Sequence, residues 1–304
     1  MNLKVPNFEI PMKNKLGTKG LLAVKLKTLK DTFKSMKGVV VAFSGGVDST
    51  LLLKTACEVL GDKVLAVTGD SETYPSQELT VAKQVAAQLG VKHMVIETEE
   101  LANENFANNP HNRCYYCKTE LFGKLVDIAG QAGYEYVVDG ANFDDISDYR
   151  PGMVAGAELG VRSPLKEAGL TKADIRTLAQ AMGLPNWNKP SFACLSSRFP
   201  YGHRITGEKL TQVDKAENYL RNLGFNQLRV RHHENIARIE VLPEDFVLIL
   251  DPAVLQPLTG YMKSLGFVYV TLDLAGFRSG SMNEVLGEEK KDGLRAVERP
   301  FGRG

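Results

Sequence analysis

An apolar run that ends in a glycine-rich turn and opens into a helical pattern constrains this chain more than any other feature. Residues 38–43 (GVVVAF) have the composition of a buried strand, and residues 50–60 have the pattern of a helix. The turn between them, residues 44–49, reads SGGVDS. The first amide groups of a helix lack intrahelical partners and carry partial positive charge, so this unit predicts a phosphate-binding loop.

Each polar or glycine residue of the turn has a role in that interpretation. Gly45 and Gly46 let the backbone approach a phosphate closely, and Ser44 and Ser49 add hydroxyl donors. Asp48 offers a hard carboxylate ligand that could hold Mg²⁺ against phosphate oxygens. The GK[ST] ending of the Walker loop is absent. The hexapeptide instead resembles the pyrophosphate loop of the ATP pyrophosphatases, which split ATP between its α and β phosphates; the alternative is an ordinary loop.

Length and charge narrow the class of protein. A chain of 304 residues with 43% hydrophobic residues can bury a substantial core and suggests two domains. The 37 basic and 36 acidic residues nearly cancel, so nothing global favours nucleic acid or an anionic membrane as partner. No apolar run approaches the roughly 20 residues that span a bilayer, and the N-terminus lacks the pattern of a signal peptide. We therefore expect a cytoplasmic protein.

Strand and helix patterns alternate through the first two thirds of the chain. Alternation of this kind predicts an α/β fold, a doubly wound parallel sheet with helices on both faces. The expected elements after the first strand and helix are strand 64–67, helix 76–89, strand 93–96, helix 119–132, strand 136–139 and helix 172–182. A further amphipathic helix over residues 19–36 precedes the first strand.

The order of elements changes beyond about Phe199, and Pro200 and Gly202 interrupt any regular structure there. The later elements are expected at residues 211–223 (helix), 227–232 and 237–240 (strands), 253–264 (helix) and 268–273 (strand). This order predicts a smaller C-terminal α+β domain for substrate binding or oligomerisation. The predicted domains are residues 1–200, which bind ATP and carry the site cysteines, residues 201–286, and a flexible tail at 287–304.

Ligands of open parallel sheets bind beyond the carboxyl ends of the strands. Thr68, Asp70 and Ser71 follow the second strand and should lie beside the phosphate loop, where they are candidates for adenine and ribose contacts. The polar run 139–145 follows a later strand in the same way, with Arg162 shortly after it. That run could bind metal or substrate; the alternative is a solvated loop in which Asp and Asn shape turns.

Cysteine spacing is the second strong signal. Cys114 and Cys117 form a C-x-x-C pair, and Cys194 lies at the far end of the same predicted domain. Cys57 differs, because it lies in the first helix among apolar residues and is interpreted as a buried, inert thiol. The C-x-x-C spacing alone fits a redox pair, half a zinc site or a cluster site. With Cys194, three thiolates suit a [4Fe–4S] cluster with one open iron, whereas zinc would want a fourth ligand such as His111.

A wider resemblance extends from the phosphate loop to about residue 283. The motifs that carry it are residues 186–189 (NWNK), 194–202 (CLSSRFPYG), 229–231 (RVR), 236–240 (IARIE), 270–274 (VTLDL) and 276–280 (GFRSG). Together they resemble the LarE family, ATP-dependent sulfur transferases of nickel-pincer-nucleotide biosynthesis within the PP-loop superfamily.

The resemblance implies a reaction and its cofactors. LarE enzymes use ATP and Mg²⁺ to adenylate the carboxylates of pyridinium-3,5-biscarboxylic acid mononucleotide, and they convert them to thiocarboxylates. Some members sacrifice one cysteine sulfur per transfer, at or next to the position of Cys194. Others have three cysteines of a cluster-binding kind, which Cys114, Cys117 and Cys194 match, with sulfide carried on a [4Fe–4S] cluster. A separate sulfur donor protein is a possible partner.

The resemblance also assigns roles to basic residues. It implies that Arg229 and Arg231 hold the substrate phosphate with bidentate hydrogen bonds, that Ser197 also contacts the substrate, and that Arg198 lies near the transferred group. Arg229 and Arg231 share one face of a strand because side chains alternate along it. Without the resemblance, the same residues could form an exposed basic strand in a neutral protein.

Three acidic residues complete the implied set. Glu217, Glu240 and Asp245 match positions that form a cation-binding pocket at a subunit interface in LarE, which implies a homo-oligomer. Taken alone, they read as surface carboxylates. The pair His232 and His233 receives no metal role, because adjacent residues on a strand point to opposite faces.

Two other classes of function remain open at this stage. A PP-loop tRNA thiolase would also combine a phosphate loop with cysteines, but such an enzyme usually has a strongly basic surface, and tRNA pulldown or modification assays would identify it. A non-catalytic nucleotide- or metal-binding regulator would bind ATP without releasing pyrophosphate. A pyrophosphate assay separates the regulator from both enzymes.

Overall fold

The computed structural model describes residues 18–147, 151–190, 193–278, 281 and 284. The expected tail at 287–304 lies outside the described residues. In the described part of the chain, no helix is both long and apolar enough to cross a bilayer.

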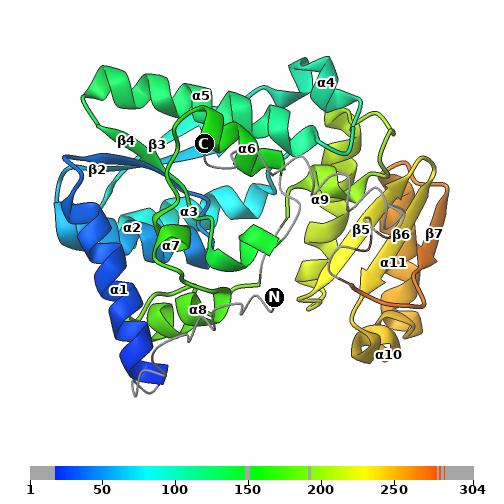
Figure 1. Ribbon diagram of the computed structural model, residues 1–304. Coiled ribbons are helices and arrows are strands. Elements are labelled where there is room, and N and C mark those ends of the chain that lie inside the picture. The colour runs from blue at the N-terminus through cyan, green and yellow to red at the C-terminus, as the bar shows by residue number, and fades with distance from the viewer. Residues whose placement is uncertain (1–17, 148–150, 191–192, 279–280, 282–283, 285–304) are drawn as a thin grey trace, which may run out of the picture.

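A four-stranded parallel sheet forms the centre of the N-terminal part (Figure 1). Its strands, in the spatial order β3-β2-β1-β4, are β1 (Val39–Ala42), β2 (Val64–Asp70), β3 (Lys92–Glu97) and β4 (Tyr136–Val138). The chain returns from one parallel strand to the next through helices, and these cover both faces of the sheet. The predicted α/β fold with a parallel sheet flanked by helices is confirmed.

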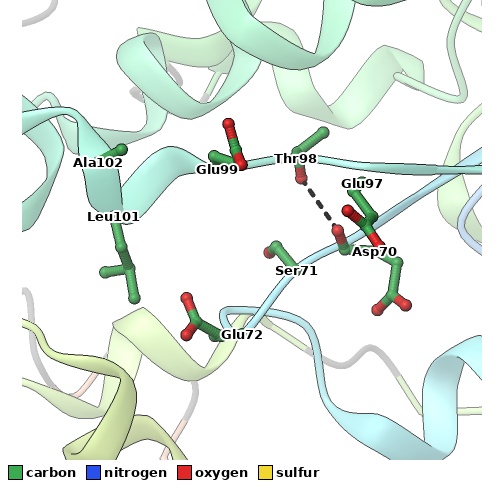
Figure 2. A pocket seen from close by; sticks show the side chains of 8 residues that line it. All are labelled: Asp70, Ser71, Glu72, Glu97, Thr98, Glu99, Leu101 and Ala102. Carbon is green, nitrogen blue, oxygen red and sulfur yellow. Dashed lines mark hydrogen bonds between the residues drawn. The ribbon is translucent and has the colours of Figure 1, made fainter.

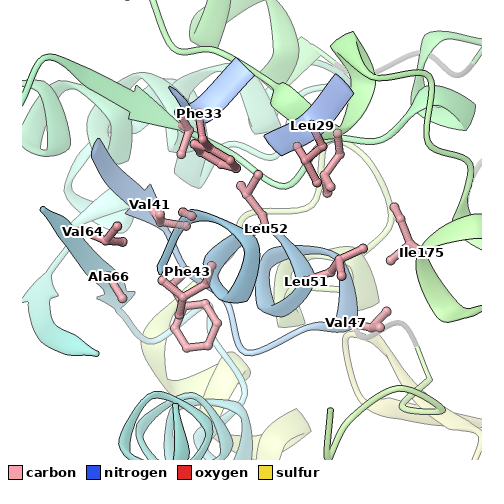
Figure 3. Close-up of a cluster of buried hydrophobic side chains, with 14 of the residues drawn as sticks. Leu29, Phe33, Val41, Phe43, Val47, Leu51, Leu52, Val64, Ala66 and Ile175 are labelled. Carbon is pink, nitrogen blue, oxygen red and sulfur yellow. The ribbon is translucent and has the colours of Figure 1, made fainter. Parts of the chain in front are cut away.

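Alternation along the strands explains why both faces carry helices. Val39 and Val41 face a core built with α1 (Thr18–Lys34) and α2 (Val47–Leu60) (Figure 3), whereas Val40 between them faces a second core under α5 (Arg113–Ala132). A strand that is buried on both sides must be apolar at every position. The further elements of this part are α3 (Ser76–Gln88), η1 (Glu100–Ala102), α4 (Glu104–Ala107), η2 (Phe143–Ser147), α6 (Pro151–Glu158), α7 (Pro164–Glu167), α8 (Lys172–Ala181) and η3 (Leu195–Arg198).

A smaller three-stranded sheet, in the order β5-β6-β7, forms the C-terminal part. Strands β5 (Leu228–His233) and β6 (Ile236–Val241) make an antiparallel hairpin, and β7 (Tyr269–Leu272) pairs parallel to β6. The hairpin turn contains Glu234 with a φ of 54°, a conformation that a tight β-turn demands. The helical elements of this part are α9 (Gly207–Asn222), η4 (Pro243–Asp245), α10 (Phe246–Ile249) and α11 (Pro252–Ser264).

The predicted elements are all present, although α2, α5 and α9 begin three to six residues earlier than expected, α5 by the most. The helix predicted from about Thr119 starts at Arg113, so both cysteines of the C-x-x-C pair are helical. Cysteine and tyrosine have modest helix propensity, so periodicity gave no signal over that first turn. The smaller C-terminal sheet is confirmed, whereas the domain boundaries stay a prediction.

Candidate active site

The phosphate loop lies where β1 ends and α2 begins. Gly45 has a φ of 68°, and a Cβ there would come within 2.9 Å of the Cα of Ala82 on α3. Only glycine combines that backbone conformation with so close an approach. Gly46 is the N-cap residue of α2, and no described side chain caps the helix at this position. The first amide groups of α2 are therefore available to an anion.

Two serine side chains shape the inside of the loop. The hydroxyls of Ser44 and Ser49 lie 3.1 Å apart, and Ser49 Oγ donates to the carbonyl of Gly46 at 3.1 Å. The hydroxyl of Tyr74 donates to the Ser44 carbonyl at 2.6 Å and holds the loop from outside. The structure thus brings together the residues that the sequence predicted for this loop.

Asn186 supports the loop from a distant part of the sequence. Its Nδ2 donates to the carbonyl of Gly45 at 2.9 Å and to Thr50 Oγ1 at 2.8 Å, and the side chain is buried. Sequence reasoning noted Asn186 as part of a family motif but gave it no role. Only the fold shows that it fixes the glycine turn.

Asp48 has a cationic neighbour that the sequence did not reveal. The side chain of Lys172, at the start of α8, forms a salt bridge with Asp48 Oδ2. The α8 N-terminus is itself fixed by a capping box between Thr171 and Asp174. A lysine and a carboxylate therefore stand together at the phosphate loop.

A cavity of about 650 Å³ opens at the carboxyl ends of β2 and β3 (Figure 2). Asp70 and Ser71 line it, as predicted, and Leu101 and Ala102 form the opposite wall. The other lining residues are Glu72, Glu97, Thr98 and Glu99. Carboxylates repel phosphate but accept hydrogen bonds from hydroxyl and amino groups, so the cavity suits a sugar or a base rather than a phosphate.

Thr68 and Arg162 lie elsewhere. Thr68 is buried, and its hydroxyl bonds to the carbonyl of Phe43 at 2.7 Å and to His93 Nε2 at 2.8 Å, behind the loop. The guanidinium of Arg162 pairs with Glu167 at 2.6 Å. Their nucleotide contacts stay predictions.

The polar run 139–145 is organised by its own hydrogen bonds. Asp145 accepts from the amide of Asn142 at 2.9 Å, and the Asn142 side chain accepts from the amide of Asp144 at 3.0 Å. Asp139 accepts from the amide of Ala141 at 3.2 Å. These bonds are the ones expected of the turn-forming alternative.

The three candidate site cysteines lie near one another, and we call them the thiol site. Cys114 and Cys117 occupy the first turns of α5 on one helix face. Burial raises the pKa of Cys117 well above its usual value, and nearby Glu100, Cys194 and Cys114 raise it further. Because the charges of Cys114 and Cys194 both act on Cys117, each of these two residues lies within electrostatic reach of Cys117.

Backbone contacts connect Cys194 to the cavity. Cys194 is the N-cap residue of η3, and the next amide, that of Leu195, donates to the carbonyl of Thr73 at 2.9 Å. Thr73 follows directly on the cavity-lining segment 70–72. Cys57 lies apart on α2, where burial raises its pKa and it packs against the main core. Its interpretation as an inert thiol agrees with this placement.

Two buried ion pairs surround the Cys194 segment. Arg198 is fully buried, bonds to Glu217 through Nε at 2.7 Å and Nη2 at 2.9 Å, and donates through Nη1 to the carbonyl of Cys194 at 3.1 Å. Arg231 bonds likewise to Glu240 and donates through Nη1 to the Ser197 carbonyl at 2.9 Å. These arginines hold the backbone that presents Cys194 and Ser197.

Electrostatics confirms that the network is rich in positive charge. Burial alone would raise the pKa of Glu217, but Arg198, followed by Arg221 and Arg229, lowers it to about 2. Burial, then the charge of Arg198 and other arginines, lowers the pKa of Arg229 to about 10. The part of this shift that comes from Arg198, Arg231 and Arg221 reflects repulsion among positive charges, which a bound anion would reduce.

The residues predicted to form a cation pocket are engaged in other contacts or lie apart from such a pocket. Glu217 and Glu240 are fully buried, and each carboxylate bonds to arginines, Glu217 also to Arg221 at 2.7 Å. Asp245 ends η4 and is half-buried. Among the described residues, no group of three or more His, Cys, Asp or Glu side chains is placed to hold one metal ion. The cation role of these residues stays a prediction.

Comparison with known proteins agrees with this arrangement. The asparagine synthase family profile matches residues 27–118, which include the phosphate loop. An uncharacterized protein of Synechocystis sp. is 47% identical over 266 residues, 88% of this chain and 99% of that protein. Pyridinium-3,5-bisthiocarboxylic acid mononucleotide synthase of Lactiplantibacillus plantarum is 47% identical over 270 residues, 87% of this chain and 96% of that enzyme.

The likeness to more distant relatives covers less of the chain. The glutamine-hydrolyzing GMP synthase of Aeropyrum pernix is 28% identical over 200 residues, 60% of this chain and 39% of that protein. The likeness to the Lactiplantibacillus enzyme, in contrast, spans nearly the whole of both chains, and the phosphate loop, the thiol site and the arginine network come together in one structure. This chain therefore belongs to the LarE family of PP-loop enzymes.

Proposed function

We propose that this enzyme uses ATP to adenylate the carboxylates of pyridinium-3,5-biscarboxylic acid mononucleotide and converts them to thiocarboxylates. A carboxylate resists attack by sulfur until its oxygen becomes part of a good leaving group. Transfer to AMP with release of pyrophosphate achieves this, and the incoming sulfur then displaces AMP. The single observation that carries the proposal is the bond between Leu195 and Thr73, which brings the segment of Cys194 to the cavity beside the phosphate loop.

The ATP phosphates are assigned to the loop. The open amides of α2 and the hydroxyls of Ser44 and Ser49 supply the donors, and Asp48 would supply an oxygen ligand for Mg²⁺. Asp48 bonds to Lys172 in this structure, so Mg²⁺ at Asp48 would compete with that lysine, and the ammonium group of Lys172 would be a further cation for the phosphates.

The substrate phosphate is assigned to the arginine network. Arg229 lies on the same strand face as Arg231, and its guanidinium is 5.1 Å from the ring centre of Phe277. The lowered pKa of Arg229 supports an anion there, since a phosphate would relieve the repulsion among neighbouring arginines. Ser197 lies close by, because Arg231 binds its carbonyl; its hydroxyl donates to the Cys194 carbonyl at 2.8 Å and accepts from Arg198 at 2.7 Å, so it would have to exchange the first bond to donate to the substrate.

The thiol site suits a [4Fe–4S] cluster. In a cluster each cysteine binds a different iron, so the sulfurs need not converge on one point as they must around a single ion. The effect of Cys114 and of Cys194 on the pKa of Cys117 supports a set of thiols of this kind. When bound, the cluster would supply an iron position for sulfide. Zinc binding, and sacrifice of the Cys194 sulfur, are the competing outcomes.

Assembly and sulfur supply complete the proposal. A homo-oligomer is part of the proposal through the resemblance of Glu217, Glu240 and Asp245 to an interface pocket of the family, and light scattering on the purified protein tests it. A separate sulfur donor protein remains part of the proposal.

The decisive experiment follows both halves of the reaction in purified protein. Anaerobic protein is incubated with ATP, Mg²⁺ and the dicarboxylate substrate; pyrophosphate is measured by coupled assay and the product by mass spectrometry. We expect Cys194→Ala to release pyrophosphate without forming thiocarboxylate, and Cys57→Ala to match the wild type. Iron and sulfide analysis of the same samples separates the cluster from zinc, and loss of H₂S mass from a cysteine would indicate the sacrificial route.

The opposing outcomes are distinct. ATP binding without pyrophosphate release would indicate a nucleotide-binding regulator and overturn the proposal. Thiolated nucleotides in tRNA after incubation, with no thiocarboxylate product, would instead indicate a tRNA thiolase.

A further inference from the structure

A buried glutamate lies against the thiol site, and sequence reasoning assigned it no role. Glu100 begins the short helix η1 and is 5% exposed. The Sγ of Cys117 donates to Glu100 Oε1 at 3.4 Å. The other oxygen, Oε2, is also buried and has no hydrogen-bond partner among the described residues.

Leaving a carboxylate oxygen buried without a partner is costly. A buried acceptor without a partner destabilises a protein by about 1–3 kcal/mol, and more when the group is charged. Native structures satisfy nearly all such groups, so each exception calls for an explanation such as an absent ion. A cation, or a donor that arrives during function, would complete the environment of Glu100.

The position of Glu100 is built into the fold. On the same short helix, Leu101 and Ala102 face the cavity (Figure 2), whereas Glu100 contacts the thiol of Cys117. The amide of the preceding residue, Glu99, donates to Glu120 Oε1 on α5 at 2.6 Å. The helix that carries the C-x-x-C pair therefore fixes the segment that carries the glutamate, and η1 borders both the cavity and the thiol site.

We propose that Glu100 is a fourth side chain of the thiol site: in the metal-free protein one oxygen orients the Cys117 thiol, and once the three cysteines bind a metal centre and the Cys117 proton is released to solvent, the other oxygen would be a ligand for that centre. This inference rests on the metal centre of the proposed function. Three cysteines leave one iron of a cubane without a protein ligand. A carboxylate oxygen is a harder ligand than thiolate and binds iron in such a site less tightly, so it occupies that position exchangeably.

The test compares an isosteric and a truncating substitution. Glu100→Gln keeps the size of the side chain and an oxygen that can accept from Cys117, but it removes the charge that makes a strong ligand. Glu100→Ala removes both functions, and Glu100→Asp retains the charge on a shorter side chain. The control is Glu104→Gln, because Glu104 is a nearby surface residue that pairs with exposed Arg204.

Two measurements are made without substrate. In the first, the protein is reconstituted anaerobically with ⁵⁷Fe and sulfide. Its iron content is measured, its iron ligands are examined by Mössbauer spectroscopy, and its affinity for hydrosulfide is measured by titration. In the metal-free protein, alkylation of each cysteine is timed by mass spectrometry. We expect Glu100→Gln to lose the oxygen-ligated iron component and to bind hydrosulfide at least about 10-fold more tightly.

The other variants separate the two roles. Glu100→Ala should also change the alkylation rate of Cys117 and reduce iron loading, Glu100→Asp should restore part of the iron component, and Glu104→Gln should behave as wild type. Wild-type spectra and hydrosulfide affinity in Glu100→Gln would overturn the inference and leave sulfur transfer intact. Wild-type protein that takes up no metal would also overturn it, while pyrophosphate release would still support adenylation.

Discussion

The phosphate loop and the arginine-bearing face of β5 are both candidate anion sites, yet they are built in opposite ways. The loop uses backbone amides and short hydroxyl side chains, and its donors point outward from the start of α2. The β5 face uses long charged side chains, and those of Arg198 and Arg231 are bonded to the buried carboxylates of Glu217 and Glu240. A phosphate site built from backbone amides can be recognised in the sequence from the spacing of its glycines and serines. The spacing of arginines does not show whether they bind a ligand or form ion pairs that stabilise the fold.

The energetic consequences of the two designs also differ. Removing one member of a buried ion pair leaves an uncompensated charge, so the cost falls on folding. A substitution in a backbone site alters the geometry that a ligand requires, so it mainly weakens ligand binding and changes the free energy of unfolding less. Substitutions in each region can therefore test whether this division holds.

The largest effect is expected from Glu217→Gln. This change leaves Arg198 and Arg221 buried near an amide that cannot balance their charge, so the free energy of unfolding should fall by about 3–5 kcal/mol. Urea unfolding measures it, and Glu208→Gln on the exposed side of α9 is the control. A loss below about 1 kcal/mol would mean that the arginines do not depend on Glu217, and the contrast with the phosphate loop would fail.

A smaller loss of stability, with a larger loss of ATP chemistry, is expected from Gly45→Ala. The change forces alanine into a φ of 68° and its Cβ toward the backbone of Ala82, which together cost about 2–3 kcal/mol. The matched control is Gly90→Ala, where φ is 64° but nothing lies within 4 Å of the added Cβ. Strain alone should cost Gly90→Ala about 1 kcal/mol.

Pyrophosphate release distinguishes the two glycine variants. Gly45→Ala should reduce it at least about 10-fold because the amides of the loop no longer meet the phosphates, and Gly90→Ala should leave it unchanged. Equal activity in both variants would show that the loop tolerates a Cβ, and the loop would lose its assignment as a phosphate site.

Local patterns predicted the elements of the fold well. The valines of β1 had to be buried on both faces, and the turn from Ser44 to Ser49 had to lie at the carboxyl edge of the sheet. Alternation also placed His232 and His233 correctly: His232 packs on the ring of Phe199, while His233 points to the opposite face with Arg231. Each of these conclusions depends on residues close together in the sequence.

The supporting side chains of the site could not be predicted in the same way. Asn186 reaches Gly45 across 141 residues, and Lys172 reaches Asp48 across 124. Glu100 meets Cys117 only because η1 packs on α5. Nothing in the local composition distinguishes these residues from ordinary surface lysine, asparagine or glutamate, so only the tertiary fold reveals them.

The smallest effect is expected from a substitution of His232. It compares the two faces of β5, because His232 lies on the apolar face and the arginines lie on the other. Its ring is stacked on Phe199, with ring centres 5.2 Å apart, and its Nε2 is 3.1 Å from Gln212 Oε1. Burial, then the charge of Lys209, lowers its pKa from 6.5 to about 4. The unfolded chain therefore takes up a proton near pH 6.5 that the folded chain refuses until about pH 4.

The sign of the pH effect follows from that difference. A lowered folded-state pKa contributes stability above pH 6.5, and this contribution is lost as the pH falls through the window from 6.5 to about 4. Between pH 7 and pH 5 the loss should be on the order of 1–2 kcal/mol. Urea unfolding at both pH values should show the full loss in the wild type and in His203→Gln, where the histidine is exposed, and a smaller loss in His232→Phe, where the lowered pKa values of His93 and His233 still contribute. A loss of wild-type size in His232→Phe would show that the effect does not come from the apolar face of β5.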